Sequence, residues 1–255
     1  MRRVAIALAF AGLLAACGGD EDPPAGAEAE PAWGYEGGNG PSQWSHLAPA
    51  YSDCAGNAQS PIDLSRGERR PPPRLEVSYE PSMATVENNG HSIEVAYARG
   101  GSIELGGTDY ELVQSHFHAP SEHTLESRRF PLEFHLVHEA KDGTRAVLGA
   151  FARVEGPNRL LEALVEAMPR QEGKTLALGR SVNALDLLPP QPATERRWSY
   201  EGSLTTPPCT EGVRWTVFER PIEVSARQLS ELTSVYSGTN RPLQSRGGRV
   251  LLVGR

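Results

Sequence analysis

Short runs in which polar and apolar residues alternate make up much of the chain after residue 75. Alternation with a period of two is typical of β-strands that bury one face. Asn-Gly or Gly-Gly dipeptides separate successive runs, and such dipeptides favour tight hairpins. The pattern therefore predicts an antiparallel meander, with strands at residues 84–87, 92–95, 102–105 and 110–113.

The same reasoning predicts strands further along the chain, at residues 112–118, 132–138, 146–154, 197–203 and 213–224. Two segments instead carry apolar residues at helical spacing, residues 159–168 and 226–235. Ser225 and Gln228 form a capping box before the second helix. We therefore expect a mainly β (α+β) fold with a large, mostly antiparallel central sheet, a few short peripheral helices and a single domain.

The first residues are typical of a targeting segment. Arg2 and Arg3 precede an apolar run over residues 4–16, which is too short to span a bilayer. The sequence Leu14-Ala15-Ala16-Cys17 resembles a bacterial lipobox. We expect a signal peptide at 1–16, a lipidated Cys17 and flexible tether at 17–32, and a folded catalytic domain at 33–255, held at a bacterial membrane in the periplasm or cell envelope. A simple cleaved signal with a chance cysteine is the alternative.

Charge and cysteine content indicate which partners are excluded and whether a disulfide forms. The formal net charge of −7, with no stripe of Lys or Arg, argues against nucleic acid as a partner. Apart from Cys17, only Cys54 and Cys209 remain, in a chain expected to reach an oxidising compartment. We expect these two to form a disulfide; two buried free thiols are the alternative.

The strongest chemical signal is a set of three histidines on two predicted strands. His116 and His118 are two residues apart, so they point to the same face of their strand, and His135 can join them from the next strand. Three imidazoles leave the fourth position of a tetrahedral zinc ion free for water, as in catalytic zinc sites. Gln114 and Glu133 share the faces of these ligands and can orient their rings.

The remaining histidines and one neighbouring glutamate allow other interpretations. His46 and His138 have no patterned partner, and His138 faces away from His135. His123 is expected to form hydrogen bonds rather than to bind metal. A cupin-type metal box that uses Glu122 as a ligand also fits His116 and His118, although the glycine and proline spacing of that box is absent.

Several motifs occur in a fixed order along the chain. They include Trp33-Gly34-Tyr35, Gln59-Ser60-Pro61-Ile62-Asp63, Asn89-Gly90-His91, Gln114-Ser115-His116-Phe117-His118, Glu133-Phe134-His135-Leu136-Val137-His138, Ala146-Val147-Leu148-Gly149, Gly202-Ser203-Leu204-Thr205-Thr206-Pro207-Pro208 and Asn240-Arg241-Pro242. With these motifs, the chain closely resembles the alpha-class carbonic anhydrases in their bacterial periplasmic form. The resemblance covers about Trp33 to Leu252.

The resemblance implies reversible hydration of carbon dioxide to bicarbonate and a proton, by attack of hydroxide held on zinc. It implies that the Asn240 backbone lies near His118, that Thr205 passes its proton toward Glu122, and that His91 carries protons. Carbon dioxide and bicarbonate are then the partners, and a homodimer is compatible with the family. The implied substrate wall is Val137, Val147, Leu204, Thr206, Val213 and Trp215, and the implied water path is Tyr35 and Asn89.

A binding or zinc-storage protein built on the same fold is the remaining alternative. Such a protein would be expected to have lost ligands, whereas the three histidines, Thr205 and Glu122 are all present. Ala119-Pro120 departs from the Trp-Gly of many animal members. That departure leaves the pocket shape and any esterase activity open, but does not touch the expected ligands.

Overall fold

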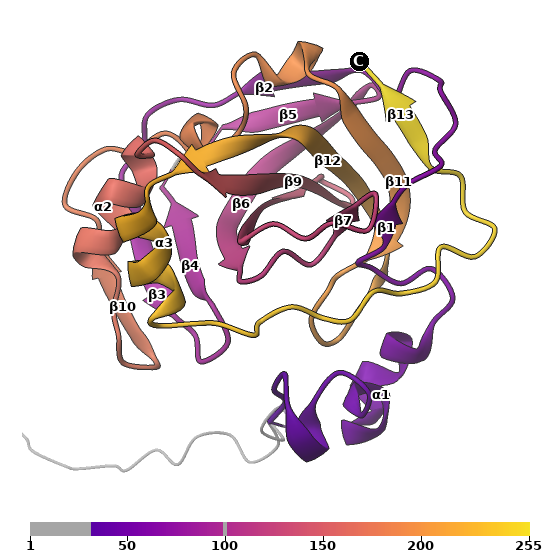
Figure 1. The fold of residues 1–255 in the computed structure, drawn as a ribbon, viewed down its shortest axis with the longest axis horizontal. Coiled ribbons are helices and arrows are strands. Elements are labelled where there is room, and N and C mark those ends of the chain that lie inside the picture. Colours follow the sequence, from indigo (N-terminus) through magenta and orange to yellow (C-terminus); the bar gives the residue numbers. More distant parts are fainter. Residues whose placement is uncertain (1–31, 99–100) are drawn as a thin grey trace, which may run out of the picture. The chain divides into compact units, whose positions relative to one another are not determined.

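Within residues 32–98 and 101–255, which the computed structural model describes, eleven strands pair into one sheet and two short strands form a separate parallel pair (Figure 1). The predictions for the signal peptide, Cys17 and nearly all of the tether fall on residues outside these ranges. The strands are β1 (Asp63–Leu64), β2 (Leu75–Ser78), β3 (Ala84–Asn88), β4 (Ile93–Tyr97), β5 (Ser102–Leu105), β6 (Thr108–His118), β7 (Thr124–Leu125), β8 (Leu132–Glu139), β9 (Arg145–Val154), β10 (Lys174–Ala177), β11 (Arg197–Ser203), β12 (Glu211–Val224) and β13 (Leu252–Gly254). The helices are α1 (Trp44–Leu47), α2 (Arg159–Ala167) and α3 (Ala226–Thr233), with short 3-10 helices at Gly37–Asn39, Pro49–Ala55, Ala184–Leu187 and Pro192–Thr194.

The strand order of the large sheet is β10-β3-β4-β6-β8-β9-β12-β11-β13. Strand β6 pairs with β5 through its first half, with β4 through its second half, and with β8 on its other side. The pair β9 and β12 is parallel, whereas the other described pairs of this sheet are antiparallel. The predicted fold class is confirmed.

Strand β6 contains a bulge that the sequence pattern did not reveal. Sequence alternation predicted two runs, 110–113 and 112–118, but the structure joins them into one strand whose register with β8 shifts between Leu112 and Gln114. Val113 lies at this shift and is 47% exposed. Because an extra residue reverses the alternation, Leu112 and Ser115 can both be buried while Gln114 and His116 face the opposite side.

The two faces of the sheet carry separate apolar clusters. One cluster packs the apolar sides of α2 and α3 against Phe134, Leu136 and their neighbours on the central strands. The other cluster contains Val147, Trp215 and Val217. Since alternate residues of β8 point to opposite faces, His135 shares the second face with these residues and His138 shares the first.

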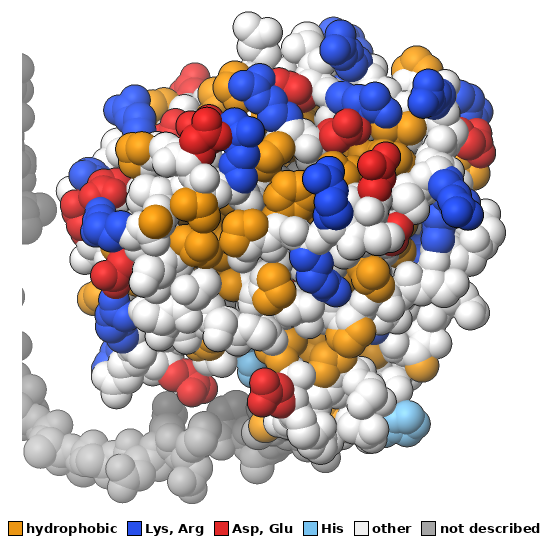
Figure 2. All heavy atoms as spheres, in the orientation of Figure 1, with side chains coloured by type: hydrophobic (Ala, Val, Ile, Leu, Met, Phe, Trp, Pro, Cys, Tyr) orange, Lys and Arg blue, Asp and Glu red, His pale blue; other side chains and the backbone are white. Residues whose placement is uncertain are grey.

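Both longer helices begin at polar caps. The side chain of Asn158 accepts a hydrogen bond from the Leu161 amide at the start of α2, and Ser225 with Gln228 forms the predicted capping box of α3. Each helix ends one or two residues earlier than predicted. Among the described residues, no helix has the length and apolarity needed to cross a bilayer. Basic and acidic side chains are intermixed on the face drawn in Figure 2.

Candidate metal centre

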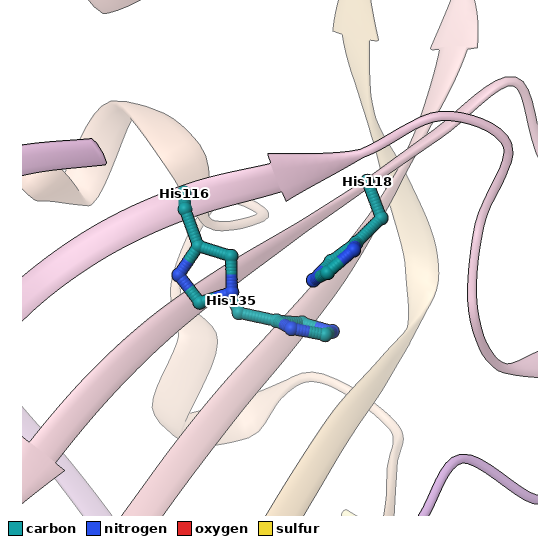
Figure 3. A group of neighbouring side chains, drawn as sticks. All are labelled: His116, His118 and His135. Atoms are coloured by element: carbon teal, nitrogen blue, oxygen red, sulfur yellow. The ribbon is translucent and has the colours of Figure 1, made fainter. Parts of the chain in front are cut away.

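Three imidazole rings meet on one face of β6 and β8. His116 and His118 project from β6, and His135 lies opposite His116 in the antiparallel register (Figure 3). The ring centroids are 5.1 Å apart for His116 and His118, 5.2 Å for His116 and His135, and 4.7 Å for His118 and His135. One ring nitrogen from each histidine lies within 4.8 Å of the others. The structure therefore brings together the three predicted ligands.

Each of these rings uses one nitrogen to donate a hydrogen bond. The Nδ1 of His116 donates to Gln114 Oε1 at 2.8 Å, and the Nε2 of His135 donates to Glu133 Oε1 at 2.9 Å. The Nδ1 of His118 donates to the carbonyl of Thr239 at 2.6 Å. The acceptor is the carbonyl of the residue before Asn240, whose backbone was expected near His118. These acceptors fix the tautomers, so Nε2 of His116, Nε2 of His118 and Nδ1 of His135 remain as free lone pairs.

The buried site favours neutral imidazoles. Burial lowers the pKa of His116 well below its usual value, and the neighbouring histidines lower it further. Burial also lowers the pKa of His118, against the opposing charge of Glu122. The Nε2 of His118 is buried and has no hydrogen-bond partner among the described residues. A buried lone pair of this kind, in a set of three imidazole nitrogens, fits the ligand set of a zinc ion.

Glu133 is fully buried and fully hydrogen-bonded. Its Oε1 accepts from His135 and from His123 Nδ1 at 2.7 Å, and its Oε2 accepts from the backbone amides of Glu122 at 2.9 Å and His123 at 2.8 Å. Burial alone would raise the pKa of Glu133, but the adjacent His123 and His135 lower it well below the usual value. A Cβ at Gly149 would lie only 3.2 Å from Glu133 Oε1, so glycine leaves the room this carboxylate needs.

The hydrogen-bond chain continues from Glu133 to Tyr200, a residue that sequence reasoning missed. His123 Nε2 lies 2.6 Å from the Tyr200 hydroxyl, and Ser60 Oγ lies 2.8 Å from the same hydroxyl. His123, Glu133 and His135 also lie close enough to count as a second metal-binding group, but their separations are those of hydrogen bonds. The prediction that His123 is a hydrogen-bonding residue is confirmed.

Glu122 is buried beside the rings of His118 and His135. Its Oε1 accepts from the Arg241 amide at 2.8 Å, while its Oε2 lies 3.4 Å from His118 Nε2 and 4.0 Å from His135 Nδ1. This Oε2 has no hydrogen-bond partner in the described part of the chain, so the expected bond from Thr205 is not formed. Burial raises the pKa of Tyr35, and the charge of Glu122 raises it further, which places Tyr35 within electrostatic range of this carboxylate.

A cavity of about 300 Å³ opens beside the rings. It brings together the metal-site residues His116 and His135 with most of the residues expected to form the substrate wall. Val213 is the exception: it belongs to the same apolar cluster as Val147 and Trp215 but does not line the cavity. The lining residues are Glu94, Val113, Gln114, His116, His135, Val137, Glu139, Arg145, Val147, Leu204, Thr205, Thr206 and Trp215.

The residues expected to carry protons do not line this cavity. His91 is half-buried, and its ring stacks on Trp33 with centroids 3.6 Å apart. Burial lowers the pKa of His91, against the charge of Glu172. The Asn89 side-chain oxygen accepts from the amides of His91 at 3.0 Å and Ser92 at 2.8 Å, so it holds the turn that carries His91.

The predicted disulfide is present. Cys54 and Cys209 are bonded, with their Cα atoms 4.9 Å apart. The Cys209 amide donates to the Thr206 carbonyl at 2.8 Å, so the bridge secures the loop that carries Thr205 and Thr206. The alternative of two free thiols is wrong.

The fold and the site define a class of metal enzyme in which three imidazoles from neighbouring strands of one large β-sheet can hold the ion. The chain belongs to the eukaryotic-type (alpha) carbonic anhydrase family, whose family model matches residues 39–251. A carbonic anhydrase of Neisseria gonorrhoeae is 37% identical over 223 residues, which cover 86% of this chain and 87% of that protein.

Solved structures give the same result. The alpha-carbonic anhydrase of Thermovibrio ammonificans, in complex with the inhibitor sulfanilamide, superposes with a TM-score of 0.83 at 38% identity, covering 88% of this chain and all of that one. Dioscorin complexed with ascorbate superposes with a TM-score of 0.79 at 30% identity, covering 87% of this chain and 97% of that one. The cupin alternative is therefore excluded. The protein is a zinc-dependent enzyme that catalyses the reversible hydration of carbon dioxide to bicarbonate and a proton.

Proposed function

We propose that His116, His118 and His135 hold the zinc ion through Nε2, Nε2 and Nδ1 respectively. The observation that carries this assignment is that each ring donates from its other nitrogen to a fixed acceptor, which leaves these lone pairs directed to one place. When bound, zinc lowers the pKa of a water in its open position to about 7, an effect for which carbonic anhydrase is the standard example.

Thr205 and Glu122 are assigned to orienting the reacting water. Thr205 lines the cavity together with His116 and His135, so its hydroxyl oxygen can accept a hydrogen bond from that water. A hydroxyl that accepts in this way needs an acceptor for its own proton. Glu122 Oε2 is a buried carboxylate oxygen without a partner among the described residues, and we assign it that role.

The apolar part of the cavity is assigned to carbon dioxide. The substrate is small and uncharged, so a surface that offers contact and excludes water is sufficient to hold it. Val137, Val147, Leu204 and Trp215 supply this surface beside His116, and Thr206 lines the same cavity.

His91 is assigned to carrying the released proton to solvent. It is half-buried and stacked on Trp33, and an unperturbed imidazole titrates near neutral pH, from which burial lowers the pKa of His91. Tyr35 and Asn89 are assigned to the water path between the cavity and this ring. Asn89 supports the path by closing the turn that carries His91.

The enzyme is further proposed to be exported and held at a bacterial membrane by a lipid on Cys17. The support is the basic start, the apolar run and the Leu14-Ala15-Ala16-Cys17 sequence, together with the disulfide, which requires an oxidising compartment to persist. Membrane fractionation of cells that express the wild type or Cys17→Ser tests the anchor. Sedimentation of the domain tests whether a second copy of the chain is a partner.

Stopped-flow hydration of carbon dioxide, with zinc quantified on the same sample, tests the proposed site. His118→Ala removes a ligand from the buried centre and is expected to abolish both zinc retention and activity. His46→Ala replaces an exposed histidine and is the matched control, expected to change neither. Full activity of His118→Ala without zinc would reject the proposal.

A further inference from the structure

Four residues on neighbouring strands lie in register, one beside the next, across the sheet. Glu87 of β3 is the register partner of Glu94 of β4, Glu94 is the partner of His116 of β6, and His116 is the partner of His135 of β8. Directly opposed residues point to the same face of a sheet. Two carboxylates therefore continue the row of metal-site histidines toward the sheet edge.

Glu94 is joined to His116 through Gln114. The Oε2 of Glu94 accepts a hydrogen bond from Gln114 Nε2 at 3.0 Å, and Gln114 Oε1 accepts from His116 Nδ1 at 2.8 Å. All three side chains line the cavity of the metal site. The chain of contacts is thus carboxylate, amide and imidazole.

The chemistry of the amide gives Glu94 a specific task. The two ends of Gln114 have the same shape, but one end only accepts hydrogen bonds and the other only donates. If the amide turned over, its NH2 group would face the N–H of His116, and donor would meet donor. A carboxylate only accepts, so Glu94 holds the NH2 end and keeps the carbonyl end toward His116.

The surroundings of Glu94 leave it available for this task. Glu94 is half-buried, and no lysine or arginine of the described chain forms an ion pair with it. The nearby Arg145 is paired with Glu139 at 3.1 Å. Partial burial reduces competition from water and so strengthens the bond to Gln114.

We propose that Glu94 is a positioning residue for His116: by fixing the orientation of the Gln114 amide, it fixes the imidazole tautomer that presents Nε2 to the metal. This inference rests on the proposed role of His116 as a zinc ligand. It assigns a function in metal retention to a residue outside the ligand set and outside its immediate hydrogen-bond acceptors.

Zinc affinity, measured by competition with a chromogenic chelator, tests the proposal without relying on activity. Gln114→Ala is expected to weaken zinc binding about 10- to 100-fold, as is usual for acceptors of ligand histidines. Glu94→Ala is expected to weaken it about threefold to tenfold, the net contribution of one hydrogen bond. The double variant is expected to match Gln114→Ala alone, because Glu94 acts only through Gln114.

Two further variants separate the hydrogen bond from charge. Glu87→Ala removes a negative charge one strand further out, from an exposed side chain that makes no hydrogen bond or ion pair within the described ranges, and is expected to leave zinc affinity unchanged. Glu94→Gln retains an acceptor oxygen and is expected to restore most of the affinity lost in Glu94→Ala. Thermal unfolding of each metal-free variant checks that it folds.

The outcomes distinguish this inference from the proposed function. A wild type that does not retain stoichiometric zinc would reject the proposed site itself. Wild-type affinity in Glu94→Ala would overturn the positioning role while leaving the site intact. The positioning role would also be overturned if the losses of zinc affinity in Glu94→Ala and Gln114→Ala added fully in the double variant. It would likewise be overturned if Glu87→Ala lost as much zinc affinity as Glu94→Ala.

Discussion

Tyr79 and His138 lie with their rings nearly parallel in the core, 5.9 Å apart between centroids and inclined by 14°. The Tyr79 hydroxyl bonds to His138 Nε2, and His138 Nδ1 lies 3.3 Å from the Ala146 carbonyl. Nδ1 donates to the Ala146 carbonyl, and in the neutral imidazole Nε2 accepts the Tyr79 hydroxyl proton. Burial lowers the pKa of His138 to about 4, although the hydrogen bonds to Ala146 and Leu136 oppose that shift.

The first prediction concerns stability against pH. Between about pH 6.5 and pH 4, His138 binds a proton in the unfolded chain but not in the folded one, so stability falls as the pH is lowered through this window. The expected loss from this residue is about 2 kcal/mol between pH 8 and pH 5. Urea denaturation of the metal-free protein at both pH values measures it.

His138→Gln serves as the comparison, because other buried histidines contribute equally to both proteins. The variant is expected to be less stable at pH 8 but to lose about 2 kcal/mol less on acidification. Identical losses in the two proteins would show that His138 is not held neutral.

The second prediction concerns the disulfide. Cys54 and Cys209 are 155 residues apart, and in the chain-entropy model so long a loop contributes about 5 kcal/mol. Replacing both by serine is expected to lower the free energy of unfolding by that amount, measured in urea. Zinc affinity is expected to be unchanged, because the ligands lie on β6 and β8. Equal stability would contradict the prediction.

The third prediction concerns proton transfer. His91→Ala is expected to slow carbon dioxide hydration about tenfold or more in weak buffer, since a positioned acid–base group typically contributes at least that much. Added imidazole is expected to restore the rate. His46→Ala, which removes an exposed histidine elsewhere, is the matched control. A His91→Ala rate that matches the wild type in weak buffer would count against the shuttle assignment.

The fourth prediction concerns the apolar wall. Val147→Phe adds bulk at the lining of a cavity of about 300 Å³ and is expected to reduce kcat/KM for carbon dioxide at least tenfold. Overpacking is also expected to cost about 1–3 kcal/mol of stability. Val154→Phe, at the exposed end of the same strand, controls for the added ring. Zinc content is expected to stay at one ion per chain in both variants. Unreduced activity of Val147→Phe would contradict the assignment of this apolar wall to carbon dioxide.

Most of the fold could be predicted because polar and apolar residues alternate along many of its strands. The alternation along β8 and the apolar spacing of α2 gave bounds within two residues of those observed. Strand β10 was missed because all four of its residues are exposed, so no burial pattern marks it. The parallel pairing of β9 with β12 was also missed, because alternation indicates a strand but not its neighbour.

The three histidines could be predicted as a group because spacing along a strand decides which face a side chain points to. The acceptors of their hydrogen bonds could be predicted only in part. Gln114 and Glu133 carry side chains two positions from a ligand, whereas the acceptor of His118 is the Thr239 carbonyl, and a backbone carbonyl has no sequence signature. Tyr200, taken alone, resembles an ordinary core aromatic residue. The motif Asn240-Arg241-Pro242 did mark the segment that holds Glu122.

The strand order also constrains the order in which parts of the structure form during folding. The ligands come from β6 and β8, antiparallel neighbours close in sequence, whereas Trp215 reaches the cavity only when β12 docks beside the distant β9. Contacts between distant segments pay a larger loop-closure entropy and tend to form late. The short ribbon of β6 and β8 can therefore form first, whereas the apolar side of the cavity closes only after β12 has docked.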